Sequence, residues 1–265
     1  MWDLDFISES DFRKHVQLSI QQYVAKLTSY DLKRFNSNIV DPIKCIFDKE
    51  VYKCTWEAVV KNEISRQRDK SNNNDIGYFH QRIFQYINGC TVPQTGWDVI
   101  FSPKESISLP DGDRVKTVFV EMKNKHNTMN SASSGKTYIR MQDQILSDDD
   151  CACFLVEAIA KRSQNITWSV SVDGVRRKHR RIRLVSIDEF YSIVTGQSDA
   201  FYKICMALPS AIEDAVNSSD VIGVPKDTVI EELHAVAESD NSSFMHAIFM
   251  LGFGSYYGFA KESNK

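Results

Sequence analysis

The segment 152–160 places the strongest constraint on how this chain folds. Its nine residues read Ala-Cys-Phe-Leu-Val-Glu-Ala-Ile-Ala, and Glu157 is the only polar one among them. A strand with one wet face alternates apolar and polar residues, whereas a near-continuous apolar run is typical of a strand covered on both faces. Helices supply that cover in most such folds. The segment therefore predicts a central sheet packed between helices.

The rest of the chain provides the helices and further strands. Strand-like runs occupy 97–101, 115–121, 166–172 and 175–185, with a turn at 110–113 between the first two. Helical spacing occupies 9–30, 56–87, 137–146, 190–194, 200–216 and 228–237. We expect Ser10 to cap the first helix, Ser186 and Glu189 to form a capping box, and 127–136 to be a loop. The polar run 70–75 favours two helices, or one bent helix, over 56–87. This order predicts an α/β (α+β) fold with a mixed central β-sheet flanked by helices.

Length and composition fit a single globular domain. The 265 residues, 42% of them hydrophobic, suit one domain over 1–265. We expect an N-terminal helical segment at 1–55, a core at 56–197 and a C-terminal helical segment at 198–265. No stretch approaches the roughly 18 consecutive apolar residues of a membrane span, and acids stand where a signal peptide has bases. These features predict a cytoplasmic protein with no membrane partner.

The six cysteines favour a reducing compartment. None forms a CxxC pair, and their neighbours are mostly apolar, as in Cys151-Ala152-Cys153-Phe154. We expect buried free thiols rather than disulfides or a zinc site.

Two acids and a lysine carry the chemistry. Glu121 and Lys123 follow the apolar run 118–120, and residues two apart on a strand project from the same face. Asp98 begins the preceding strand, so antiparallel pairing across the 110–113 turn brings Asp98 and Glu121 to one end of the sheet. Two carboxylates there suit Mg²⁺, which prefers oxygen ligands. Lys123 would then stand beside a water attacking phosphorus.

The alternative is that Glu121 and Lys123 form an ordinary ion pair on a wet strand. The unbroken apolar run before them argues against a wet strand, because it predicts burial on both faces. A buried acid and base are costly unless they are paired or hold a metal.

The pattern of Asp98 followed by Glu121-Met122-Lys123 resembles the PD-(D/E)XK nuclease signature, with Trp97 standing where that pattern has proline. More narrowly, 121–128 is similar to type II restriction endonucleases that cut GGNCC. The resemblance extends through 76–81, 136–138, 157–161 and 190–196, and spans about residues 40–215. It implies a restriction-endonuclease-like fold and a homodimer that hydrolyses double-stranded DNA with Mg²⁺, leaving 5′-phosphates. A cognate DNA methyltransferase is the implied genetic partner.

The same resemblance implies roles for individual residues. Asp98 and Glu121 would bind the metal, and Lys123 would orient or activate the attacking water. Many members add an acid from the helix before the sheet, and Glu63 is one candidate for it. The alternative for Glu63 is an exposed helical side chain beside Arg66, three residues on.

DNA contacts are expected from the basic middle of the chain. Residues 115–183 hold 13 Lys and Arg against 7 Asp and Glu, whereas 205–265 hold 3 against 9. The formal net charge of −3 therefore hides a basic segment and an acidic one. Besides the catalytic residues, the candidate DNA-binding residues are Lys125, Asn127, Thr128, Lys136, Arg140, Lys161, Arg162, Gln164, Asn165, Arg176 and Arg177. The alternative for the basic run 176–183 is a solvated β-hairpin.

Two other functions stay open on the sequence alone. A structure-directed or repair nuclease of the same superfamily would share the site but cut branched or damaged DNA. A non-catalytic DNA-binding protein would use Glu121 and Lys123 only as an ion pair. The sequence also leaves open whether the tail 249–259 packs on the core or forms a dimer contact.

Overall fold

The computed structural model describes residues 2–218 and 226–254, which fold into two compact units. The first unit comprises Met1–Gln22 and Asn73–Asp220, and the second comprises Tyr23–Asn72 and Val221–Lys265. The helix α4 (Trp56–Arg82) begins in the second unit and ends in the first. The segment boundaries expected at 55 and 197 stay predictions.

The first unit contains a mixed six-stranded sheet in the order β1-β2-β5-β6-β8-β7. Its strands are β1 (Cys90–Thr91), β2 (Val99–Phe101), β5 (Thr117–Lys125), β6 (Cys151–Ile159), β7 (Asn165–Val172) and β8 (Val175–Ser186). The central strands β5, β6 and β8 are parallel, and the pairs β1–β2, β2–β5 and β7–β8 are antiparallel. This mixed sheet flanked by helices confirms the predicted fold class.

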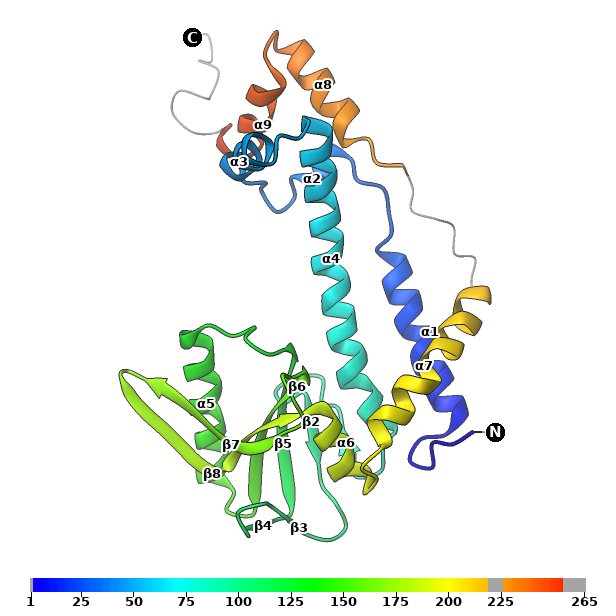
Figure 1. The fold of residues 1–265 in the computed structure, drawn as a ribbon, viewed down its shortest axis with the longest axis vertical. Helices are drawn as coiled ribbons and strands as arrows, with labels where there is room; N and C mark the ends of the chain where they lie inside the picture. Colours follow the sequence, from blue (N-terminus) through cyan, green and yellow to red (C-terminus); the bar gives the residue numbers. More distant parts are fainter. Residues whose placement is uncertain (1, 219–225, 255–265) are drawn as a thin grey trace. The chain divides into compact units, whose positions relative to one another are not determined.

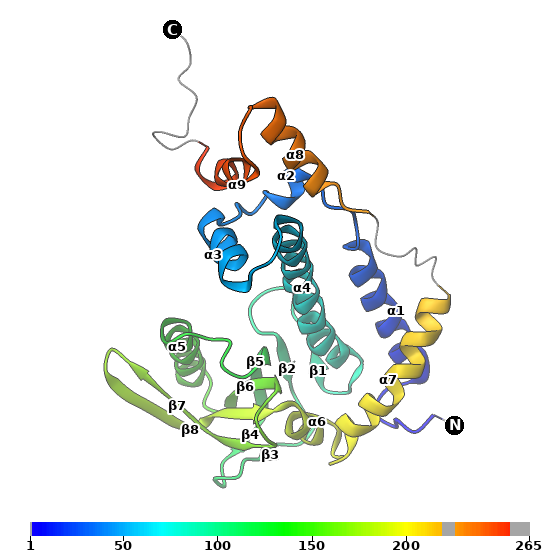
Figure 2. The ribbon, with the colours of Figure 1, turned by 45° about the horizontal axis from the view of Figure 1, so that its top comes forward.

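Both faces of the sheet are covered, as the apolar run in β6 predicted. Phe154 and Val156 lie in one hydrophobic core with residues of α1 (Glu9–Ala25), η1 (Ile83–Tyr86), α6 (Ile187–Thr195) and α7 (Ala200–Asn217). Cys153 and Leu155, one residue out of phase, lie in a second core with α5 (Ser131–Ser147). Figure 2 shows α5 and α6 on opposite sides of the sheet.

The connection from β2 to β5 contains a small hairpin. Strands β3 (Ile107–Ser108) and β4 (Arg114–Val115) pair around the predicted turn, where Gly112 has a φ of 88°. Such a positive φ favours glycine, which has no Cβ to clash. The antiparallel pairing of β2 with β5 is confirmed, with this hairpin between them.

The second unit consists of helices around a core of its own. Its elements are α2 (Leu32–Phe35), α3 (Pro42–Tyr52), the first part of α4, α8 (Val229–Ser239) and α9 (Phe244–Phe253). Phe35, Val60 and Leu233 are fully buried in this core. Asp41 caps α3, and its carboxylate accepts hydrogen bonds from the N–H groups of Ile43 and Lys44. The part of the expected tail beyond residue 254 lies outside the described residues.

Several predicted element boundaries are wrong. One continuous helix, α4, includes the polar run 70–75, so the expected division into two helices is wrong. The first helix ends at Ala25 rather than near 30, and Ser8 accepts the N–H of Asp11 in place of the predicted cap Ser10. Helix α5 begins at Ser131, inside the expected loop, because Asn130 caps it by accepting the N–H of Ser133.

The predicted capping box is also wrong. Ser186 occupies the N-cap position of α6, but its hydroxyl makes no cap bond. It instead accepts the N–H of Gln164 at 2.9 Å, which ties β7 to the start of the helix.

The structure also bears on the expectations of free cysteines and of no membrane-spanning segment. All six cysteines are free; Cys45, Cys90, Cys151 and Cys153 are buried, and Cys54 and Cys205 are half-buried. No helix in 2–218 or 226–254 is long and apolar enough to span a bilayer.

Candidate active site

Asp98 and Glu121 face each other across the β2–β5 pair. The register pairs Val99 with Val120, so Asp98, one residue before β2, lies opposite Glu121. The Asp98 N–H donates to the Val120 carbonyl at 2.9 Å, and the Met122 N–H donates to Asp98 Oδ2 at 2.6 Å. The structure therefore brings the two acids together at the end of the β2–β5 pairing, beside the middle of β5.

The Glu121 carboxylate accepts from two cations. Lys123 Nζ lies 2.7 Å from Glu121 Oε1, and Arg140 Nη1, on α5, lies 3.1 Å from Oε2. The Glu121 side chain is only 15% exposed. The ion pair with Lys123 exists, but it is enclosed between β5 and α5 rather than spread on a wet strand.

The surroundings of Asp98 disfavour the ionised form of its carboxyl group. Burial raises the pKa of its carboxyl, the N–H of Met122 lowers it, and the neighbouring Glu121 raises it again. Lys123 and Arg140 lower the pKa by smaller amounts. A half-buried acid beside a second acid is stabilised in its ionised form by a cation. A divalent ion is such a cation, and carboxylate oxygens are the ligands that Mg²⁺ prefers.

The metal-binding capacity of this site rests on two protein carboxylates. Among the described residues, no group of three or more His, Cys, Asp or Glu side chains is arranged so that it could hold a metal ion. Mg²⁺ is commonly held by one or two carboxylates, with water and substrate phosphate completing its coordination. Asp98 and Glu121 fit that donor set.

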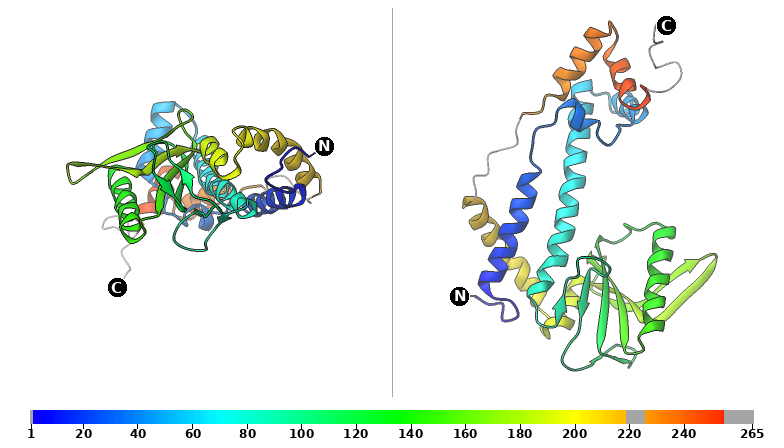
Figure 3. Two further views of the ribbon diagram at one scale, coloured as in Figure 1. Left: turned by 90° about the horizontal axis from the view of Figure 1, so that it is seen from below. Right: turned by 180° about the vertical axis from the view of Figure 1, so that it is seen from behind.

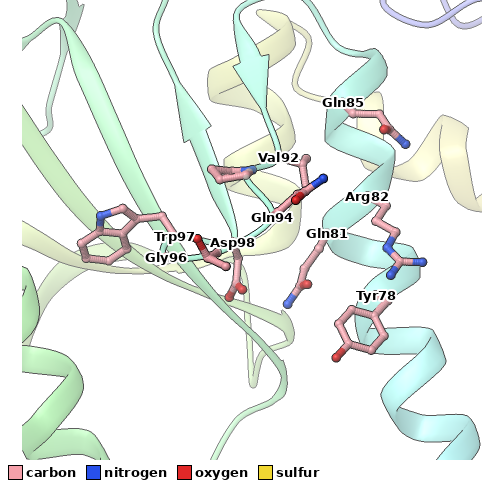
Figure 4. Close-up of a pocket in the computed structure, with 11 residues that line it drawn as sticks. Tyr78, Gln81, Arg82, Gln85, Val92, Gln94, Gly96, Trp97 and Asp98 are labelled. Carbon is pink, nitrogen blue, oxygen red and sulfur yellow. The ribbon is translucent and has the colours of Figure 1, made fainter.

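Asp98 also lines a pocket of about 410 Å³ in the first unit. The other walls come from the end of α4, from η1 and from residues 92–97 before β2. Figure 4 shows the Gln81 and Asp98 side chains in the same space. Gln81, Arg82 and Gln85 were missed by the sequence reasoning; the signal was two glutamines four residues apart just before the sheet, which the structure places at the end of α4 and in η1.

A smaller pocket of about 170 Å³ brings together four of the predicted residues. Lys123, Lys125, Asn127 and Thr128 line it, with Glu157 on the neighbouring strand. Burial raises the pKa of Glu157, and the nearby His126 and Lys161 lower it.

The remaining candidate DNA-binding residues are dispersed over the first unit. Lys136 is exposed on α5, Lys161 and Arg162 are exposed in the β6–β7 turn, and Gln164 is half-buried there. Asn165 accepts from the buried Arg183 through its side chain and its carbonyl, so it is engaged inside the fold.

The basic run of β8 divides into two parts. Arg180 pairs with Asp113, Arg181 donates to backbone carbonyls, and Arg183 pairs with Asp111. Toward the tip, Arg176, Arg177 and Lys178 are exposed, and Arg176 donates to Ser169 at 3.1 Å. Figures 1 and 3 show this β7–β8 hairpin extending beyond the other strands. The tip of the β7–β8 hairpin is therefore solvated, and it also presents a basic surface.

Glu63 lies in the second unit and is buried, with 7% of its surface exposed, rather than exposed as expected. Its carboxylate accepts from Arg66 at 2.7 Å and from Gln67 at 3.1 Å. The expected pairing with Arg66 is confirmed. Glu121, Lys123 and Arg140, which act on the carboxyl group of Asp98, all belong to the first unit.

The mixed sheet between helices, with an acid before one strand and acid-x-lysine on its antiparallel neighbour, defines a nuclease of the restriction-endonuclease-like fold. The model of the Eco47II restriction endonuclease family matches residues 4–217, and the chain belongs to that family.

Two relatives support this assignment. The type II restriction enzyme Sau96I of Staphylococcus aureus is 26% identical over 258 residues, which cover 94% of this chain and 95% of that protein. The type II restriction enzyme Eco47II of Escherichia coli is 27% identical over 220 residues, covering 79% and 87% of the two chains. The prediction of a type II restriction endonuclease, a site-specific deoxyribonuclease that binds DNA, is confirmed.

Proposed function

We propose that this restriction endonuclease hydrolyses phosphodiester bonds of double-stranded DNA at GGNCC-like sites, using Mg²⁺ and leaving 5′-phosphates. The observation that carries the proposal is the juxtaposition of Asp98, Glu121 and Lys123 at one end of the β2–β5 pair. The similarity of 121–128 to enzymes that cut GGNCC supports the choice of site.

The three side chains have distinct roles in this proposal. Asp98 and Glu121 would hold Mg²⁺, which would supply Lewis-acid stabilisation of the charge that develops on the phosphate. Lys123, whose ammonium is fixed by Glu121, orients the attacking water. Lys125, Asn127 and Thr128 follow directly on the chain and contact the DNA backbone near the cut.

The active form is a homodimer. A site such as GGNCC is two-fold symmetric apart from its central base, and a two-fold protein presents one catalytic centre to each strand. The enzyme acts in the cytoplasm, where a cognate methyltransferase protects the host DNA. Sedimentation with and without a cognate duplex tests the dimer: one duplex should bring two chains together.

A cleavage assay tests the reaction. The purified chain with Mg²⁺ should cut a duplex containing one GGNCC site and spare a duplex of scrambled sequence. The products should be ligated without prior kinase treatment, because they carry 5′-phosphates.

Lys123→Ala tests the mechanism. We expect cleavage to fall by about 10²–10⁴-fold, the usual contribution of a group that assists proton transfer. Lys116→Ala is the matched control, because Lys116 forms an exposed pair with Asp150 and lies outside the site. A Lys123→Ala variant that cuts like Lys116→Ala contradicts the mechanism. Cleavage of branched but not plain duplex would indicate a structure-directed nuclease.

A further inference from the structure

Arg140 lies between Glu121 and the ring of Trp97. Its guanidinium carbon is 3.8 Å from the centre of the indole ring, and its Nη1 is 3.1 Å from Glu121 Oε2. The guanidinium is planar, so one side chain stacks on the ring with its face and donates to the carboxylate with its edge. Oε2 of Glu121 therefore accepts from an arginine whose own position is fixed by the Trp97 ring.

Trp97 is fixed in turn by its neighbours. Its Nε1 donates to Gln144 Oε1 at 3.3 Å, and its ring packs on Phe119 with 5.6 Å between centroids. Gln144 follows Arg140 by four residues on α5, so the two side chains share one face of that helix. One helix thus fixes both the indole and the cation stacked on it.

Arg140 is not paired as a purely structural arginine would be. Its Nη2 is buried and has no hydrogen-bond partner among the described residues, although an unsatisfied buried donor costs free energy. Its geometry serves the carboxylate instead.

We propose that the Trp97–Arg140 stack is a positioning device for Glu121, an inference that rests on the proposed function. Lys123 donates to Oε1 from the same strand, whereas Arg140 donates to Oε2 from α5. The two donors together fix the plane of the carboxylate. Arg140 is a positioning residue, since it acts on the reaction through Glu121.

Arg140→Ala tests the proposal by single-turnover cleavage at saturating DNA and Mg²⁺. We expect the rate to fall about 10²-fold, the effect of misplacing a reacting group by about 1 Å. The DNA dissociation constant, measured in EDTA, should change less than threefold. Millimolar guanidinium should restore part of the rate, because it refills the space on the Trp97 ring.

Three further variants separate positioning from other roles. Arg34→Ala is the matched control, because Arg34 also stacks on an aromatic ring, Tyr30, at 4.4 Å, but lies in the second unit. Trp97→Leu should lower the rate as Arg140→Ala does, and guanidinium should not rescue it. Arg140→Lys should recover little, because an ammonium cannot stack and donate as the planar group does.

Each result of these experiments either supports or overturns the positioning role of Arg140. A slow Arg140→Ala enzyme with unchanged EDTA binding and guanidinium rescue supports the proposal. A rate within threefold of the parent overturns it, and so does a loss of DNA affinity that accounts for the whole rate change, since Arg140 would then be a DNA contact. If Arg140→Ala does not fold, an unimpaired Trp97→Leu enzyme overturns the proposal. Failure of the parent chain to cut any DNA would instead contradict the proposed function.

Discussion

Among individual residues, the site depends on the register of β2 and β5, which places Asp98 directly opposite Glu121. Asp98 and Glu121 could be paired from sequence because side chains alternate along a strand and the turn at 110–113 implied antiparallel pairing. Arg140 was expected on α5, but as a DNA contact rather than as a partner of Glu121. Gln81 was not assigned a role at all. The rotation of a helix about its axis depends on packing against distant residues, which no local pattern encodes.

We expect the buried His15 to make the free energy of unfolding of the first unit depend on pH. Its ring is buried, its Nε2–H donates to the Phe79 carbonyl at 3.0 Å, and burial lowers its pKa to about 4. Between pH 6.5 and 4 the unfolded chain binds a proton that the folded chain excludes, so the free energy of unfolding falls as the pH falls. The loss for this residue is on the order of 2–3 kcal/mol.

The variant His15→Phe should flatten that dependence, since it removes the titrating ring but keeps contact with Phe79. Urea unfolding at pH 7 and pH 4.5 measures the difference in free energy. His80, whose pKa burial also lowers to about 4, remains in the variant and should retain part of the slope. An unaltered difference between the two pH values would show that His15 does not contribute.

At the element scale, α4 shows why a polar run misleads. The segment 70–75 contains three consecutive asparagines, which have low helix propensity and favour turns. The structure continues the helix through it, with Asp75 buried and its neighbours Asn73 and Asn74 exposed. A few tenths of a kcal/mol per residue do not break a helix that packing holds on either side.

Two glycines in helices should respond oppositely to alanine. Gly77 lies inside α4, and a Cβ there would meet no atom within 4 Å. Gly77→Ala should stabilise the protein by about 0.5–1 kcal/mol, since alanine has the better helix propensity. At Gly252 in α9, a Cβ would lie 2.8 Å from the Pro42 ring, so Gly252→Ala should destabilise by about 1–3 kcal/mol. Thermal unfolding measures the melting temperature of each variant, and shifts of the same sign relative to the parent would contradict this comparison.

The β7–β8 hairpin shows that one basic run serves two purposes. Its tip turns at Asp173-Gly174, where both residues have positive φ, and its exposed bases lie next to that turn. Farther from the tip, Arg183 is 2% exposed and pairs with Asp111 and Asn165, which secures β8 to its neighbours. This division of the run could not be predicted from the sequence, because the acidic partners Asp111 and Asp113 lie in the distant 110–113 turn.

At the scale of the whole molecule, the formal charge of −3 is a poor guide to what the protein binds. The basic segment 115–183 lies in the first unit, with the candidate site, whereas many of the C-terminal acids belong to the second. This distribution was visible in the sequence. The division of the chain into units with separate cores was not, because the core of the second unit joins residues within 30–64 to residues within 229–251, across a long sequence separation.

The salt dependence of DNA binding tests whether the hairpin tip contacts phosphate. Each phosphate contact adds about 0.9 to the slope of log affinity against log salt. The double variant Arg177→Ser/Lys178→Ser should therefore lower the slope by about 1–2 and weaken binding to cognate and scrambled duplexes alike. Lys61→Ser/Lys70→Ser, which removes two exposed lysines of α4 in the second unit, is the matched control. Equal slopes for the two double variants would show that the tip projects past the DNA, and a loss confined to the cognate duplex would show that it reads bases instead.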